Sequence, residues 1–223
     1  PIAHVEAGLR SFNKEMPEEL NRILTDHVSQ FLFCPTTQAV ANLKNEGIIK
    51  GVHHVGDIMY DAMLFAKEII HDNIESFNQK LNFVQDKFAL TTIHRQESTR
   101  DNKIFLDLME YVEQFAQERN LKVVFPVHPR VQNIIQPYKD NTRFFFLEPV
   151  TYFEMQYLLG RADVVLTDSG GLQKEAYFHR VPCVTLRSET EWVETIEAGW
   201  NKLWTESYYQ SQKSISDYGH GKT

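Results

Sequence analysis

The sequence predicts an α/β fold in which parallel sheets carry helices on both faces. Short apolar runs alternate with longer stretches of helical spacing along the whole chain. Most of these runs are apolar over several consecutive residues and do not alternate with polar ones, which is typical of parallel strands that are buried on both faces. The chain has 223 residues, of which 42% are hydrophobic and 24% charged. It therefore carries enough apolar material for a globular core.

The first third of the chain is expected to contain three strand–helix pairs. Its apolar runs lie at 2–5, 31–34 and 53–56. Helices are expected at about 18–28, after the N-cap residue Thr36, and at about 57–70. Residues 71–84 are polar and irregular. We therefore place a boundary there between two domains, 1–72 and 73–223.

The rest of the chain repeats the pattern more clearly. Strands are expected at 87–93, 122–127, 143–147, 163–167 and 183–186. Helices are expected at 102–119, just after Pro129, at 151–159 and at 172–178. Ligands of parallel sheets bind at the carboxyl ends of the strands. The polar residues directly after each strand are therefore where chemistry is expected.

Charge and cysteine content exclude several classes of protein. Lys and Arg number 23 against 30 Asp and Glu, a formal charge of −7, which argues against a nucleic-acid partner because such proteins need a basic face. No apolar stretch approaches a membrane span. Cys34 and Cys183 lie at the ends of apolar runs and are expected to be buried and unpaired, as in a cytoplasmic protein. The chain opens at Pro1 inside an apolar run, so we expect upstream sequence to be missing.

Four strands of the second part end in side chains that suit anion binding or proton transfer. These ends carry His94 and Arg95, then His128, then Asp168–Ser169–Gly170–Gly171, and finally Arg187 and Glu191. In a parallel sheet all four ends reach the same edge, so we expect these residues to line one crevice. The coincidence of four such ends is more informative than any single residue.

The segment Ser169–Gly170–Gly171 lies between a predicted strand and a predicted helix. Two glycines allow close approach of the backbone, and the N–H groups at a helix start attract an anion such as phosphate. Alternatively, Ser169 is only an N-cap and the glycines only make the turn. Glu175, further along this helix, either accepts ribose hydroxyls or is an ordinary solvated carboxylate.

His94 and His128 are candidate functional histidines, and Arg95 and Arg187 are candidate ligands of a diphosphate, which the planar guanidinium group matches. Alternatively, each histidine closes a strand as a partly buried residue, and each arginine pairs with a nearby acid. The histidines and cysteines show no metal-site spacing, so no bound metal is expected.

The first third holds a second group of candidates. Glu6 ends an apolar run, and Glu18 follows Pro17 in the first turn of a predicted helix. Two carboxylates on neighbouring elements suit general acid and base catalysis. The alternative for Glu18 is stabilisation of the helix dipole. The chain has no G-x-S-x-G elbow, Walker lysine loop or G-x-G-x-x-G turn, so hydrolase, NTPase and simple dehydrogenase functions lack support.

The order of the motifs resembles that of a known family. HVEAGLRS, PEELNR, T-x-HR, FPVHP, DSGGLQKEA and LRSETEWVE occur as in the non-hydrolysing UDP-N-acetylglucosamine 2-epimerases, over essentially the whole chain. The resemblance implies two Rossmann-like lobes of the GT-B type, with the N-terminal lobe incomplete here. It also implies a UDP-sugar between the lobes, no nicotinamide or metal cofactor, a part in cell-envelope polysaccharide biosynthesis, and a homodimer of the intact protein.

The resemblance also implies residue roles. Glu6, Glu18 and His94 match catalytic residues of the family. Substrate-binding roles are expected for Arg22, Arg95, His128, Ser169, Gly170, Gly171, Glu175, Arg187 and Glu191. The implied reaction eliminates UDP across C1 and C2 of the sugar to give 2-acetamidoglucal, and UDP then re-adds with C2 reprotonated on the other face.

Two departures from the family pattern leave the substrate open. Trp192 and Val193 stand where the family commonly has Arg-Pro, and Lys174 replaces a frequent glutamate, where we expect it on the exposed side of the helix. The Trp-Val variant resembles the branch that acts on UDP-2,3-diacetamido-2,3-dideoxy-glucuronate. Two further alternatives are a GT-B glycosyltransferase, which the carboxylates Glu6 and Glu18 disfavour, and a UDP-binding fragment without turnover.

Overall fold

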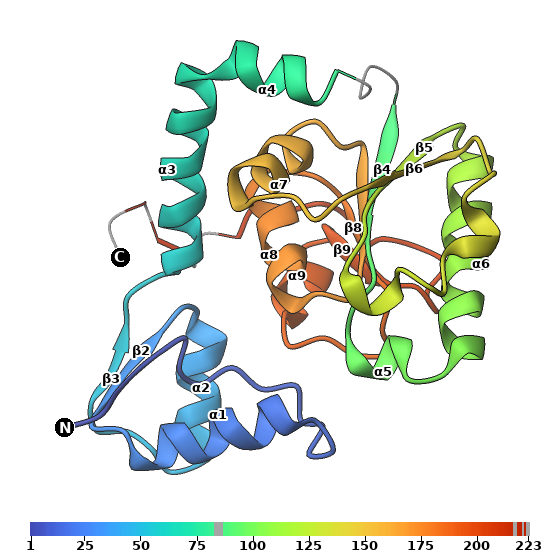
Figure 1. Ribbon diagram of the computed structural model, residues 1–223. Coiled ribbons are helices and arrows are strands. Elements are labelled where there is room, and N and C mark those ends of the chain that lie inside the picture. Colours follow the sequence, from blue (N-terminus) through green and yellow to red (C-terminus); the bar gives the residue numbers. More distant parts are fainter. Residues whose placement is uncertain (83–86, 216–217, 220, 222–223) are drawn as a thin grey trace.

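The computed structural model describes residues 1–82, 87–215, 218–219 and 221. In these residues the chain forms a three-stranded sheet followed by a six-stranded sheet. The smaller sheet and its helices lie below the larger one in Figure 1, and a long helix rises above the smaller sheet and stands beside the larger one. Every strand pairing in the described part of the chain is parallel, which confirms the predicted fold class.

The smaller sheet has the strand order β1-β2-β3. Its strands are β1 (Ala3–Val5), β2 (Phe31–Cys34) and β3 (Val52–His54), and its helices are α1 (Pro17–Val28) and α2 (Thr37–Asn45). The predicted N-cap is confirmed, because the Thr36 hydroxyl accepts the N–H of Ala39 at 3.1 Å. Leu32 and Cys34 pack with Leu43 of α2 in a small core.

Helix α3 (Ile58–Asp72) leads from the smaller sheet to the larger one and is capped by Asp57, whose carboxylate accepts the N–H of Met59 at 2.8 Å. It packs on helices of the second sheet, with Met63 among Tyr177, Phe178 and Tyr218. The irregular segment expected at 71–84 is wrong in part, because α4 (Ile74–Lys80) follows α3 almost directly. Residues 83–84 of that segment lie outside the described residues. The domain boundary after residue 72 stays a prediction.

The larger sheet has the order β6-β5-β4-β7-β8-β9. Its strands are β4 (Phe88–Thr92), β5 (Lys122–Pro126), β6 (Phe144–Leu147), β7 (Val164–Thr167), β8 (Cys183–Thr185) and β9 (Asn201–Leu203). Its helices are α5 (Gln96–Thr99), α6 (Asn102–Glu118), α7 (Tyr152–Leu159), α8 (Gly170–Phe178) and α9 (Val193–Glu197), with two 3₁₀ turns at Pro129–Val131 and Gln136–Tyr138. The turn after Pro129 was predicted, whereas α9 and β9 were not.

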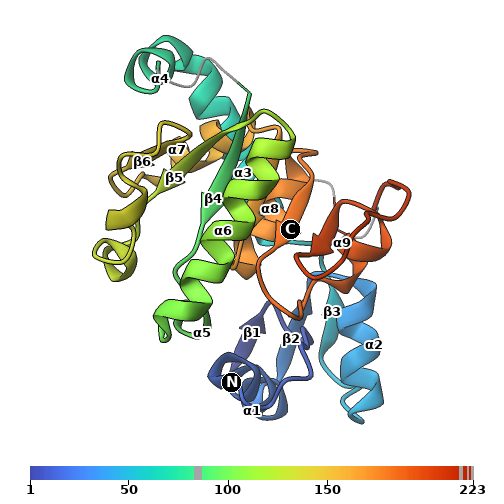
Figure 2. The ribbon, with the colours of Figure 1, turned by 90° about the vertical axis from the view of Figure 1, so that its right-hand side faces the viewer.

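Both faces of the larger sheet are buried, as the apolar strands predicted. Successive residues of β4 point to opposite sides, so Ala89 packs with the α6 residues Phe105 and Met109, while Leu90 packs with Leu158 of α7 and Ala176 of α8. Figures 1 and 2 show α6 on one side of the sheet and α7 and α8 on the other. Residues that follow the strands are therefore held on a rigid layer.

Within the described residues, no helix is long and apolar enough to cross a membrane. Cys34 and Cys183 are both buried and free, as predicted.

Candidate functional site

The strand order makes β4 and β7 neighbours, although β5 and β6 come between them in the chain. From β4 the chain runs outward to β5 and β6, and from β7 it runs outward to β8 and β9 on the other side. The loops after β4 and β7 therefore diverge, and parallel sheets bind ligands at such a point. His94 follows β4 and Ser169 follows β7, so two of the predicted strand ends meet here.

Asp168 ties these two loops together. It is fully buried, and its carboxylate accepts the backbone N–H of His94 at 2.9 Å and that of Arg95 at 2.8 Å. The His94 ring Nδ1 lies 3.5 Å from the same carboxylate. Burial lowers the pKa of His94, and Asp168 offsets part of that shift. Sequence analysis assigned Asp168 no role, although a carboxylate directly after a continuously apolar strand is a signal for a buried acceptor.

The turn between β7 and α8 is packed so closely that only glycine fits at its first helical position. A Cβ atom on Gly170 would lie 2.2 Å from Oε1 of Glu191, whereas one on Gly171 would approach only the methyl group of Met59, at 3.3 Å. Ser169 caps the helix through its hydroxyl. The first N–H groups of α8 have no carbonyl partner within the helix, so the turn presents donors to an anion.

Arg95 and Arg187 reach the same turn and share Glu191. Arg187 Nη1 lies 3.0 Å from one oxygen of that carboxylate, and Arg95 Nη2 lies 3.8 Å from the other. Burial would raise the pKa of Glu191, but Arg187 and Arg95 outweigh it and hold that pKa below its ordinary value. Arg95 Nη1 is buried and has no hydrogen-bond partner among the described residues. The Arg95 guanidinium therefore keeps a free donor near Gly170.

Glu175 is buried one turn further along α8, contrary to its alternative as a solvated carboxylate. Gln156 of α7 donates to its Oε1 at 2.8 Å, and His179 contacts the amide oxygen of Gln156, also at 2.8 Å. Burial raises the pKa of Glu175 to about 7, against the effects of Gln156 and Lys174. Burial, and then the Glu175 charge, raise the pKa of Tyr152 to about 12. Glu175 is thus a buried acceptor with Gln156 and Tyr152 as hydrogen-bonding neighbours.

His94 and His128 lie side by side at the ends of β4 and β5. Their ring centroids are 5.5 Å apart and the rings are nearly parallel, at 24°. His128 is exposed, and its Nδ1 accepts the backbone N–H of Arg130 at 3.1 Å, which leaves Nε2 to carry the proton of the neutral ring. Both histidines border a small, mainly apolar depression that also includes Val150 and Met155. Two of the four strand ends thus border one depression, and the expectation that all four line one crevice stays a prediction.

Lys174 contradicts the expectation of an exposed position. Its side chain is fully buried, and its Nζ lies 2.8 Å from Glu6 Oε1 and 2.6 Å from Asp57 Oδ2. The Trp192 ring covers the same ammonium group, with its centroid 4.1 Å from Nζ. The two departures from the family pattern, at 174 and 192, are thus in contact. Glu6 itself has φ 68°, a left-handed conformation that is rare for a residue with a side chain.

The other candidates of the first third lie near the N-terminus of α1. Glu18 is exposed in its first turn, two residues after Met16, whose sulfur lies 3.5 Å from Arg187 Nη2. Arg22 pairs with Glu19 at 2.7 Å instead of pointing freely at a ligand. Burial would raise the pKa of Glu19, but hydrogen bonds from Arg22, Ser11 and Phe12 lower it. Glu19 thus holds the loop before α1, a role that sequence analysis missed.

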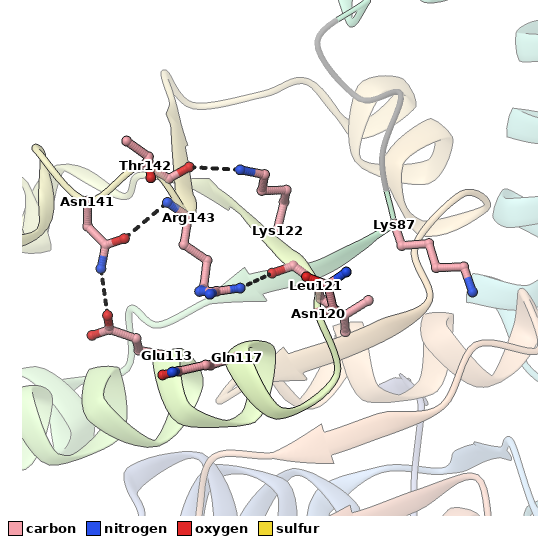
Figure 3. Close-up of a pocket in the computed structure, with 9 residues that line it drawn as sticks. All are labelled: Lys87, Glu113, Gln117, Asn120, Leu121, Lys122, Asn141, Thr142 and Arg143. Atoms are coloured by element: carbon pink, nitrogen blue, oxygen red, sulfur yellow. Dashed lines mark hydrogen bonds between the residues drawn. The ribbon is translucent and has the colours of Figure 1, made fainter.

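A polar depression at the opposite end of the larger sheet is lined by none of the predicted site residues (Figure 3). Lys87, Lys122 and Arg143 lie there, at the amino ends of β4, β5 and β6. Their neighbours already satisfy part of this group, because Lys122 donates to the carbonyl of Thr142 and Arg143 to that of Leu121. The candidate site is therefore the carboxyl edge of the sheet. Within the described residues, no three His, Cys, Asp or Glu side chains gather in a way that would hold a metal ion.

Parallel sheets with helices on both faces, and a glycine turn between β7 and α8 at the switch point of the larger sheet, define an α/β protein of the Rossmann-like class. Comparison with known proteins agrees with this class. The family model described as UDP-N-acetylglucosamine 2-epimerase matches residues 1–219. The chain belongs to this family.

Several relatives are similar over most of the chain. A UDP-N-acetylglucosamine 2-epimerase homolog of Methanococcus maripaludis is 49% identical over 91% of this chain and 57% of its own length. The UDP-2,3-diacetamido-2,3-dideoxy-D-glucuronate 2-epimerase of Pseudomonas aeruginosa is 47% identical over 91% of this chain and 56% of its own. The chain thus spans little more than half the length of these curated relatives.

A solved structure is likewise similar over nearly the whole of this chain but over only part of its own. The crystal structure of the Methanocaldococcus jannaschii UDP-GlcNAc 2-epimerase, in complex with UDP-GlcNAc and UDP, matches with a TM-score of 0.86 and 36% identity. The match covers 99% of this chain and 66% of that one.

Proposed function

We propose that the whole protein is a non-hydrolysing UDP-sugar 2-epimerase that interconverts UDP-N-acetylglucosamine and UDP-N-acetylmannosamine. The observation that carries the proposal is the turn at Gly170. The start of α8, the Arg95 guanidinium with its unpartnered Nη1, and Arg187 gather around this turn, where Glu191 holds both arginines. A diphosphate provides the oxygens that such a set of donors needs.

The surroundings of this turn support a uridine nucleotide. Glu175 lies one turn further along α8 with its carboxylate buried, where it would accept the ribose hydroxyls. The apolar depression beside Val150 and Met155 lies at the ends of β4 and β5 and would take the uracil ring. Diphosphate, ribose and base are thus accommodated in sequence along one edge of the sheet.

The reaction needs a base for the proton on C2 of the sugar. As that proton leaves, its electron pair forms the C1–C2 double bond, the C1–O bond breaks, and UDP departs with the bonding pair. The arginines at the Gly170 turn stabilise the charge that develops on the diphosphate. Addition of UDP back to C1 and of a proton to the other face of C2 gives the epimer.

We assign the proton transfers to Glu6, Glu18 and His94. Lys174, on the same helix as the glycine turn, contacts Glu6, which supports a carboxylate close to the sugar end of a bound nucleotide. Glu18 lies in the helical turn that follows Met16, and Met16 contacts Arg187. His94 has a pKa lowered by burial, so it is neutral at pH 7 and able to accept a proton.

A second candidate substrate is UDP-2,3-diacetamido-2,3-dideoxy-glucuronate. The Pseudomonas aeruginosa relative that carries this name is 47% identical, and Trp192 with Val193 resembles that branch. Trp192 is buried among residues of the smaller sheet and covers Lys174. Any influence of Trp192 on substrate choice would therefore act through Lys174 and Glu6.

Solvent deuterium tests the proposal. The whole protein is incubated in deuterium oxide with UDP-N-acetylglucosamine, and separately with the diacetamido-uronate substrate, and the recovered UDP-sugars are analysed by mass spectrometry and NMR. A 2-epimerase places deuterium at C2 of its substrate and product. Absence of deuterium from both sugars would overturn the proposal, and transfer of the sugar to an acceptor would favour the glycosyltransferase.

Glu6→Gln and His94→Asn are the matching variants. Each is expected to lower the exchange rate by about 10²–10⁴-fold while UDP affinity stays within about twofold, because general acid–base groups act on the sugar and not on the nucleotide.

We also place the protein in the cytoplasm, since Cys34 and Cys183 are free and buried. We further propose that the intact protein is a homodimer.

A further inference from the structure

Lys174 is a buried cation that connects the two sheets. It lies on α8 of the larger sheet, and its partner Glu6 follows β1 of the smaller sheet, 168 positions earlier in the chain. The three N–H donors of an ammonium group here face Glu6, Asp57 and the ring of Trp192. A lysine is almost never fully buried unless it is paired in this way.

The two ion pairs of Lys174 differ in the parts of the chain that they join. Asp57 caps α3, and α3 packs on α8 through Met63, Tyr177 and Phe178. The Lys174–Asp57 pair therefore lies within one packed unit. Glu6 belongs instead to the smaller sheet, where it follows β1. The Lys174–Glu6 pair is the one that breaks if the two sheets move apart.

The contact also fixes the direction of the Glu6 carboxylate. Lys174 engages Oε1, and the side chain remains 38% exposed, which leaves Oε2 for another partner. The backbone of Glu6 is held at φ 68°, so the side chain starts from an unusual direction. In the described part of the chain, Lys174 is the hydrogen-bond and ion-pair partner of this carboxylate.

We propose that Lys174 is a positioning residue for Glu6. It holds the carboxylate toward the sugar when the two sheets are together and releases it when they separate, while Asp57 keeps the lysine charge compensated in both states. Assembly of the acid–base group is thereby coupled to closure around the substrate. This inference rests on the proposed 2-epimerase function for its kinetic consequence.

The test uses Lys174→Met in the whole protein, with Lys103→Met as the matched control. Lys103 is exposed in the first turn of α6 and is not among the candidate site residues. We expect Lys174→Met to lower kcat by about 10–100-fold, because a misplacement of about 1 Å has effects of that order. UDP affinity should stay within about twofold in the variant that combines Lys174→Met with Asp57→Asn, because the opposite effects of these two charges on the pKa of Glu175 are then both removed. Lys103→Met should change neither quantity.

A double-mutant cycle separates positioning from a general structural effect. If Lys174 acts through Glu6, then Lys174→Met in the Glu6→Gln background causes no further loss of kcat. Equal fold-losses in both backgrounds would overturn the proposal. Because Lys174→Met leaves Asp57 buried without its partner, Lys174→Met with Asp57→Asn serves as a second variant with both charges removed. Wild-type kcat in that folded double variant would also overturn it.

A stability cycle keeps the inference distinct from the proposed function. Unfolding of the wild type, the two single variants and the double variant at positions 6 and 174 measures their coupling without any substrate. Coupling in a protein that exchanges no deuterium would support the contact and reject the proposed reaction. Absence of coupling would overturn the positioning role, whatever the activity.

Discussion

Glu191 occupies the space in which residue 170 would otherwise carry a side chain. A Cβ atom there would lie 2.2 Å from Glu191 Oε1 and 3.5 Å from Arg95 Nη2. The absence of a side chain thus lets a buried carboxylate and an arginine approach the start of α8. In this arrangement Glu191 balances the arginines and lies beside the buried backbone of Gly170.

Gly170→Ala is therefore expected to displace Glu191 and disturb both arginines. The cost in unfolding free energy is expected to be about 1–3 kcal/mol, as for other overpacked sites, and UDP affinity should fall at least about tenfold. Thermal unfolding and calorimetry measure the two effects. Gly171→Ala is the matched control for stability, because its Cβ would meet only the flexible end of Met59 at 3.3 Å. Equal destabilisation by both variants would contradict the packing argument.

Binding of the nucleotide sugar is expected to depend on pH through Glu175. Burial raises the pKa of Glu175 to about 7, and ribose hydroxyls donate to its ionised form. Affinity for UDP-N-acetylglucosamine should therefore fall as the pH drops below about 7, approaching a tenfold loss per pH unit. The diphosphate diester of this ligand does not titrate in that range. Calorimetry from about pH 5.5 to pH 8 measures the slope, and Glu175→Gln should bind weakly and without it.

The Glu175 carboxyl group should also make the unliganded protein less stable as the pH rises. Glu175 has a folded pKa of about 7 against an ordinary value of 4.5, so the folded state holds its proton more tightly. Its contribution to stability is complete below about pH 4.5 and is lost as the pH rises through about 7. Glu175→Gln should therefore be more stable than the wild type at about pH 8, by on the order of 2–3 kcal/mol. Denaturant unfolding at both ends of this range checks the sign.

Asp168→Asn is expected to lower the pKa of His94 further. Burial already lowers that pKa, and the Asp168 charge acts in the opposite direction. Removing the charge leaves burial unopposed. An NMR titration of the His94 ring measures the change, and Asp101→Asn, at the exposed cap of α6, should leave it unaltered. A rise in the pKa of His94 would show that Asp168 does not act through its charge.

The strands of the larger sheet were predictable because burial on both faces requires a continuous apolar run. The runs at Phe88–Thr92 and Val164–Thr167 stand out for this reason, and the polar residues after them followed directly. The short helix α4 has no buried residue and so no clear apolar stripe. It was mistaken for an irregular junction.

Contacts between distant parts of the chain could not be predicted in the same way. Lys174 was placed on the exposed side of α8 because a lysine on a helix usually faces solvent. Every residue from Leu172 to Phe178 is buried, however, since α3 and the smaller sheet cover the side that would otherwise be open. Nothing in the local spacing around Lys174 indicates Glu6 or Asp57 as its partners, and Gln156 was missed for the same reason.

The left-handed backbone conformation of Glu6 is unfavourable for stability, whereas its carboxylate is needed for the proposed reaction. A non-glycine residue in this region carries a strain of about 1–2 kcal/mol, which glycine would relieve by its greater freedom. Glycine would also remove a partner of the buried Lys174 ammonium group, so the two effects oppose each other in the free energy of unfolding. A variant with glycine at this position would still bind UDP through the other sheet, yet it would lack the carboxylate that we assign to proton transfer.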